Sequence, residues 1–203
     1  PEVGPVIAAL QQGGIEQTAV HNHLLNESPR IVYVHIDGSG DAAKLASALK
    51  AALAVTKTPP AVAASAQLPS IAFDTAQVDQ ALGRTGKNNN GIYQFSVPRA
   101  ESVRDMDMEI PPAMGTATVI NFQPTGDGRA AITGDFVLRA KEVNPVIRAL
   151  TANGIAVTAI HSHMLTEEPR LLFMHFWAND DPVKLARGLR AALDETNSAP
   201  ASK

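Results

Sequence analysis

The first 53 residues contain apolar side chains at two spacings, one typical of helices and one typical of strands. Residues 2–12 place apolar side chains three and four positions apart, which predicts a helix ended by a pair of glycines. Residues 31–36 are rich in β-branched and aromatic side chains and predict a strand. Asp41 is a suitable N-cap for a second helix. With a preceding strand that contains His21 and His23, the predicted unit is α-β-β-α.

The same order of patterns returns in residues 141–193. The segment KEVNPVIRAL corresponds to PEVGPVIAAL at the start of the chain, and DPVKLARGLRAAL corresponds to DAAKLASALKAAL. An amphipathic hairpin flanked by helices buries one sheet face under those helices. The sequence therefore predicts an α+β fold of duplicated α-β-β-α units, with antiparallel sheets, helices packed on one face, and a pseudo-twofold relation.

Three segments are expected along the chain. Residues 1–53 form a partial first repeat, residues 54–70 form a linker rich in Ala and Pro, and residues 71–203 form a complete second repeat. Only the second repeat has a lead-in, which predicts a helix and several strands. A complete first repeat would extend upstream of Pro1, so we expect that the chain was cut there, although an incomplete duplication gives the same pattern. The lead-in elements are expected at residues 74–85, 92–97, 105–109, 117–123 and 130–138.

All histidines of the chain lie in two stretches, HNHLLNESPRIVYVH and HSHMLTEEPRLLFMH, whose matching positions are 140 residues apart. In the first stretch, His21 and His23 lie on one face of a strand. A hairpin centred near Pro29 would make His23 and His35 cross-strand neighbours, with Cβ atoms about 5 Å apart. Three imidazoles would then converge, with Glu27 near the turn as a candidate fourth ligand. The matching residues of the second stretch are His161, His163, His175 and Glu167.

Three histidines with an open fourth position are typical of catalytic zinc sites, and other transition metals also bind imidazole. We therefore expect a transition metal, with zinc as the first candidate and copper as the alternative. A metal-binding protein is the leading interpretation. A metal-dependent hydrolase or lyase is the second, with Glu27 or Glu167 as ligand or general base. The third is a metal-free module for a small anionic ligand or a glycan. Arg30 and Arg170, beside the turns, are candidates to bind an anion.

Composition narrows the range of partners. The formal net charge is −3 and basic residues are not clustered, so nucleic-acid binding has no electrostatic support. The chain has no cysteine, which excludes thiolate metal sites and disulfides. No apolar run reaches the roughly 18 residues of a membrane span. The expected partners are a metal ion or a small anionic ligand, and the oligomeric state is left open.

Several longer motifs resemble the LppY/LpqO family of bacterial envelope proteins, a group of unknown function. They are EVNPVIRAL, HSHMLTEEPR, DQALGRTGK and TATVINFQPTGDGRAAITGDFVL, and the resemblance extends over essentially the whole chain. It implies an exported protein with a periplasmic or extracellular location. The chain departs from the family pattern in the export region and the front half of the first repeat, neither of which is present in this sequence.

Overall fold

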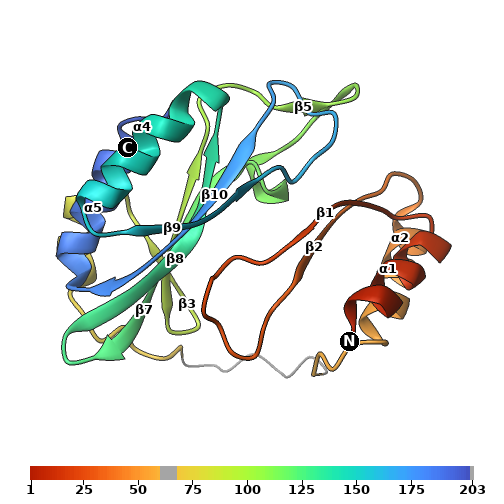
Figure 1. The fold of residues 1–203 in the computed structure, drawn as a ribbon, viewed down its shortest axis with the longest axis horizontal. Coiled ribbons are helices and arrows are strands. Elements are labelled where there is room, and N and C mark those ends of the chain that lie inside the picture. The colour runs from red at the N-terminus through yellow and green to blue at the C-terminus, as the bar shows by residue number, and fades with distance from the viewer. Residues whose placement is uncertain (60–67, 202–203) are drawn as a thin grey trace. The chain divides into compact units, whose positions relative to one another are not determined.

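The computed structural model describes residues 1–59 and 68–201 (Figure 1). It divides into two compact units, residues 1–65 with 163–165 and residues 66–162 with 166–203. By chain connectivity, residues 163–165 belong to a hairpin of the second unit. Part of the expected linker, residues 60–67, lies outside the described residues.

The first unit has the order α-β-β-α. Its elements are α1 (Val3–Gln12), β1 (Glu16–His21), β2 (Tyr33–Asp37) and α2 (Ala42–Leu53), and the two strands pair in antiparallel fashion. The side chain of Asp41 accepts a hydrogen bond from the Lys44 amide at 2.9 Å, so Asp41 caps α2 as predicted. Among the described residues, the buried core of this unit is small and consists of Leu10, Ile15, Ala48 and Ala52.

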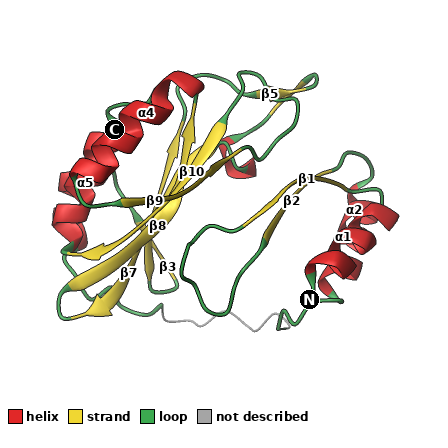
Figure 2. Cartoon of the chain, viewed as in Figure 1, coloured by secondary structure: helices red, strands yellow, loops and turns green. Residues whose placement is uncertain are grey.

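The second unit contains the same order of elements at its C-terminal end, behind several further strands. It is built on one six-stranded antiparallel sheet, in the order β3-β4-β7-β8-β10-β9 (Figure 2). Two short strands, β5 and β6, form a separate hairpin. The strands are β3 (Lys87–Asn89), β4 (Ile92–Pro98), β5 (Arg104–Asp105), β6 (Met108–Glu109), β7 (Ala117–Gly126), β8 (Arg129–Leu138), β9 (Ala156–His161) and β10 (Leu172–Asp180). The helices are α3 (Thr75–Leu82), the 3₁₀ turn η1 (Pro112–Met114), α4 (Ala140–Ala152) and α5 (Pro182–Leu193).

One face of this sheet carries the core. Alternate residues of the four inner strands, such as Phe95, Phe122, Phe136 and Phe176, are buried in one cluster with apolar residues of α3, α4 and α5. Helices α4 and α5 lie over one face of the sheet (Figure 1). Because side chains alternate along a strand, His175, which directly precedes Phe176 in β10, lies on the opposite face. The predicted α+β fold with helices on one face is confirmed.

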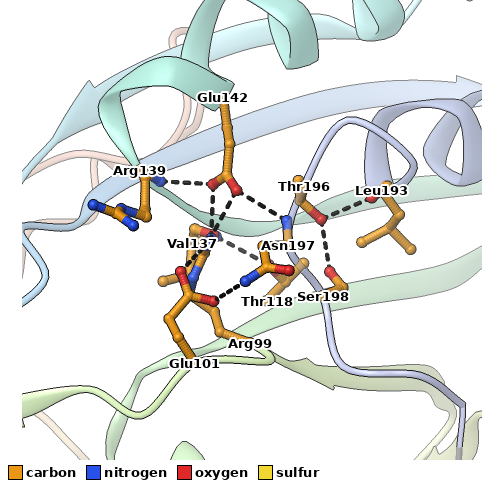
Figure 3. Close-up of polar contacts among 10 residues, drawn as sticks. All are labelled: Arg99, Glu101, Thr118, Val137, Arg139, Glu142, Leu193, Thr196, Asn197 and Ser198. Carbon is orange, nitrogen blue, oxygen red and sulfur yellow. Dashed lines mark hydrogen bonds and ion pairs between the residues drawn. The ribbon is translucent and has the colours of Figure 1, made fainter.

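A buried cluster of polar side chains lies at the start of α4 in the second unit (Figure 3). The guanidinium of Arg99 binds both oxygens of Glu142 at 2.8 and 2.9 Å, and it also binds Glu101 at 2.7 Å. Glu142 accepts further hydrogen bonds from the backbone amides of Arg139 and Asn197. This cluster therefore joins the end of β4, the first turn of α4 and the segment after α5.

The predicted register of the first hairpin is wrong. His35 pairs with Ala19 and Tyr33 pairs with His21, with a register shift between Gln17 and Ala19. His23 is therefore not a cross-strand neighbour of His35 but follows β1 in the connection. The prediction assumed a tight turn near Pro29, whereas β2 begins only at Tyr33 and leaves a long irregular connection.

The lead-in also differs from expectation in two places. Strand β3, in the KNNNG segment, is not among the expected elements, and it is followed by a turn in which Asn90 has a positive φ of 51°. The strand expected at residues 105–109 is a tight hairpin of two-residue strands, with its turn at Met106. In both places a residue with positive φ reverses the chain, and strand alternation does not reveal such a reversal.

Candidate metal centre

The first hairpin brings three imidazoles together through strand geometry and chain direction. Ala19 lies opposite His35, and residues 19 and 21 share a face, so His21 and His35 are diagonal neighbours. Their ring centroids are 4.8 Å apart. His23 reaches the same place from the connection, with its ring centroid 5.0 Å from that of His21.

One ring nitrogen from each of these three histidines lies within 4.8 Å of the other two. In a tetrahedral zinc site the ligand nitrogens are about 3.3 Å apart, as zinc–nitrogen distances near 2.0 Å require. Small rotations of the half-buried imidazoles would close the difference. The three side chains are thus arranged as a possible set of metal ligands.

Hydrogen bonding determines which nitrogen of His21 is available as a ligand. Its Nδ1 lies 3.3 Å from the carbonyl oxygen of Asn22. A carbonyl only accepts, so Nδ1 carries the proton and the lone pair of the neutral ring is on Nε2. Burial lowers the pKa of His21, and the Asn22 carbonyl offsets only part of that shift. The neutral form favoured near pH 7 is the form that binds metal.

An aromatic side chain supports the first cluster. The ring of Tyr33 stacks on that of His23, with centroids 3.5 Å apart and planes only 4° from parallel. Burial raises the pKa of Tyr33, and the charge of Glu27 raises it further. Tyr33 therefore lies beside the histidines of the first cluster.

The second hairpin repeats this arrangement in a more buried setting. Ala159 pairs with His175 and Phe173 pairs with His161, so His161 and His175 are again diagonal neighbours, 4.8 Å apart. A ring nitrogen of His163 also lies within 4.8 Å of a nitrogen of each. His163 and His175 are only 7% and 1% exposed. The Nδ1 of His161 lies 3.3 Å from the Ser162 carbonyl, as in its twin.

Strand β8 supplies the support behind His175. The carbonyl oxygen of Gly134 accepts a hydrogen bond from Nδ1 of His175 at 3.0 Å, which leaves the lone pair on Nε2. A carbonyl on the second nitrogen is a common way to orient a metal-ligating histidine. Asp135, directly opposite His175 on β8, places a carboxylate oxygen 3.8 Å from the same Nδ1. Burial raises the pKa of Asp135 to about 8.

Asp135 was missed by sequence reasoning. It is the only carboxylate in the strand RAAITGDFVL, and an isolated acid in an otherwise apolar strand was a usable signal. What the sequence does not contain is the pairing of β8 with β10, which brings Asp135 to the histidines.

The two glutamates stabilise the connections. Glu167 is 2% exposed, and its oxygens accept from the Leu171 amide at 3.0 Å and from Arg170 at 3.1 Å. In the first hairpin, Glu27 accepts from the Ile31 amide at 3.2 Å. Within the described residues, neither glutamate belongs to a group whose ligand atoms converge, because those groups contain histidine alone.

The two arginines lie at the surface of the connections. Arg170 has a side chain that is 54% exposed, and it binds Glu167 and, at 3.0 Å, the hydroxyl of Ser162. Arg30 is exposed. Ser162 lies between two histidines, so the positive charge of Arg170 is next to the second cluster.

Comparison with known families gives a match over most of the chain. The family described as Domain of Unknown Function (DUF1259) matches residues 1–55 and 76–195, which include all six histidines. Neither curated proteins nor solved structures gave a match. Because the match covers most of the chain, the protein belongs to the DUF1259 family, a family of unknown function.

Proposed function

We propose that this is a metal-binding protein with one three-histidine site in each hairpin. The observation that supports this most strongly is the convergence of a ring nitrogen from each of three histidines to within 4.8 Å, in both hairpins. The sites are His21, His23 and His35 in the first unit and His161, His163 and His175 in the second.

Zinc is the metal that this donor set favours first. Three neutral imidazoles suit zinc, which accepts nitrogen ligands in a tetrahedral arrangement, and the lack of cysteine removes the thiolate ligands that select other sites. Copper is the alternative, since copper also binds imidazole and stands above zinc in general affinity.

A metal-dependent hydrolase or lyase is the second candidate. Three protein ligands leave a coordination position for water, and a bound metal lowers the pKa of that water. The carboxylate of Asp135 beside His175 is a candidate general base in this scheme. It fits that role better than Glu167, whose oxygens already hold the Leu171 amide and Arg170. Arg170 and Arg30 would then attract an anionic substrate.

Two broader statements accompany this proposal. We propose that the hairpin units descend from a duplication, which the shared order of elements and the offset of 140 residues support. We also propose a periplasmic or extracellular location, for which the support is the resemblance to the LppY/LpqO envelope proteins. Among the described residues, no helix combines the length and apolar character needed to cross a membrane.

Elemental analysis tests the metal proposal. The full chain is purified without a histidine tag and without chelator, and its content of zinc, copper, manganese, iron and nickel is measured. We expect one or two equivalents of a transition metal. The variant with all six histidines changed to Gln should contain less than a tenth of that amount, while Asn26→Ala, an exposed change in the first connection, should match the wild type.

The opposite result is equally clear. A wild-type protein that carries no metal, and takes up none from micromolar zinc, copper or manganese, contradicts the proposal. Circular dichroism of both variants confirms that a loss of metal is not a loss of fold. The enzyme alternative gains support if the metal-loaded wild type hydrolyses an activated ester and an Asp135→Asn variant with full metal content does not.

A further inference from the structure

The two histidine clusters differ in how firmly the surrounding structure holds them. We infer that the two sites fill in a fixed order, with His161, His163 and His175 binding metal first and tightly, and His21, His23 and His35 binding more weakly and exchanging. This inference rests on the proposed function and assigns a different role to each of the two sites. The second site would retain an ion, and the first site would take up and release one.

The first support is the position of each hairpin in its sheet. Strand β10 pairs with β9 on one side and with β8 on the other, and His175 is 1% exposed. In the described part of the first unit, β2 pairs with β1 alone, and all three histidines are half-buried. A ring held by two neighbouring strands loses little further freedom when it binds a metal, which favours tighter binding.

The second support is the orientation of a ligand by groups behind it. The Gly134 carbonyl, 3.0 Å from Nδ1 of His175, selects the tautomer with its lone pair on Nε2. Gly134 belongs to β8, and a strand in that position is described only for the second hairpin. Loss of such an outer contact typically weakens metal binding about 10- to 100-fold.

The third support is the anchoring of the connection that carries the middle histidine. In the second hairpin, Glu168 exchanges two backbone hydrogen bonds with Arg104 of β5, at 2.8 and 2.7 Å. The hydroxyl of Thr166 binds Asp105 of the same strand at 2.6 Å. These bonds hold the connection at Thr166 and Glu168, C-terminal to His163.

The first connection is held more lightly. It is closed by the Glu27 bond to the Ile31 amide and by a hydrogen bond from the Asn22 side chain to the Ile31 carbonyl. Residues 28–33 are exposed throughout. His23 therefore belongs to a segment with more freedom to move than the segment that carries its twin.

Matched double variants test the order of filling. The twin pairs His21→Gln with His23→Gln, and His161→Gln with His163→Gln, remove two ligands from one cluster each and leave the deeply buried His175 intact. Zinc is titrated into the metal-free full chain in competition with a chromogenic chelator, and native mass spectrometry counts the bound ions. We expect two equivalents in the wild type, the first bound at least about tenfold more tightly than the second.

Each variant has a distinct expected result. The His161/His163 variant should lose the tight equivalent and keep the weak one, whereas the His21/His23 variant should keep the tight equivalent with unchanged affinity. Equal affinities within threefold, loss of the tight equivalent in the His21/His23 variant, or a single equivalent lost in both variants would overturn the order while leaving metal binding itself established. Absence of zinc binding by the wild type would overturn the proposed function and this inference together.

Discussion

Arg99 and Glu142 show how single residues support the second unit. Both side chains are almost fully buried, at 3% and 5% exposed, and a charge is kept in such a place only with a partner and further hydrogen bonds. Glu142 also satisfies two backbone amides, one at the start of α4 and one in the segment after α5. Its removal would therefore leave a buried cation and open two junctions of the chain.

We predict that Glu142→Gln lowers the free energy of unfolding by about 3 kcal/mol, since it leaves Arg99 with only Glu101 as a charged partner. Urea denaturation followed by the fluorescence of Trp177, the single tryptophan of the chain, measures this in the second unit. The exposed Glu195→Gln should stay within about 0.5 kcal/mol of the wild type. Equal midpoints for the two variants would show that the buried pair does not stabilise the fold.

The difference in unfolding free energy between the wild type and Glu142→Gln should depend on pH. Burial alone would raise the pKa of Glu142, but the hydrogen bonds from Arg99 and from two backbone amides outweigh it and hold the pKa below 4.5. Because the unfolded chain then binds the proton more readily, the stabilisation is present above pH 4.5 and is lost as the pH falls through the folded pKa. The gap between wild type and Glu142→Gln should therefore shrink in acid.

At the scale of elements, helices and caps could be predicted from the sequence, but strand registers could not. The glycine pair predicted the C-terminal end of α1, and Asp41 predicted the start of α2. The structure has both helix boundaries there. The register of β1 with β2 depends on a shift between Gln17 and Ala19, which no local residue preference shows.

The same distinction between predictable and unpredictable features applies to the candidate site. The clustering of three histidines in each hairpin was predicted from the repeated spacing, but with the wrong register, since His23 reaches His21 from the irregular connection and does not lie across from His35. The contribution of β8 was not predicted, because Gly134 and Asp135 reach His175 only through pairing between distant strands.

Gly134 gives a prediction at this scale. A Cβ built on it would lie 2.1 Å from the Val119 carbonyl oxygen and 2.8 Å from the ring of Phe176. Gly134→Ala must therefore push β8 away from its neighbours, and we expect it to destabilise the second unit by about 2 kcal/mol. The same shift would move the carbonyl that orients His175.

The urea midpoint of Trp177 fluorescence and the affinity for the tight zinc equivalent should both fall in Gly134→Ala. Gly4→Ala is the control, because a Cβ there meets nothing within 4 Å and alanine favours the helix. If Gly134→Ala matched Gly4→Ala in both measurements, the result would contradict the close packing of β7, β8 and β10 around Gly134.

For the whole molecule, the two units differ in the size of their cores. The second unit buries aromatic and aliphatic side chains from its sheet and all three of its α-helices in one cluster. The described part of the first unit buries two large side chains, Leu10 and Ile15, with two alanines, and leaves Val20 and Ile36 about half exposed. Stability scales with buried apolar area, so the first unit opens at a lower free-energy cost.

Amide hydrogen exchange of the metal-free full chain should show this difference directly. We expect the amides of β8 and β10 to exchange most slowly and those of β1 and β2 to exchange at least about tenfold faster, since fewer buried contacts oppose their opening. The twin strands β2 and β10 provide the comparison within one sample. Zinc in excess should slow exchange in β10 by a larger factor than in β1 and β2, because the stabilisation that a ligand gives grows with its affinity and the second site binds zinc more tightly. Equal protection of β2 and β10 without metal would contradict both this prediction and the difference in rigidity from which the order of filling was inferred.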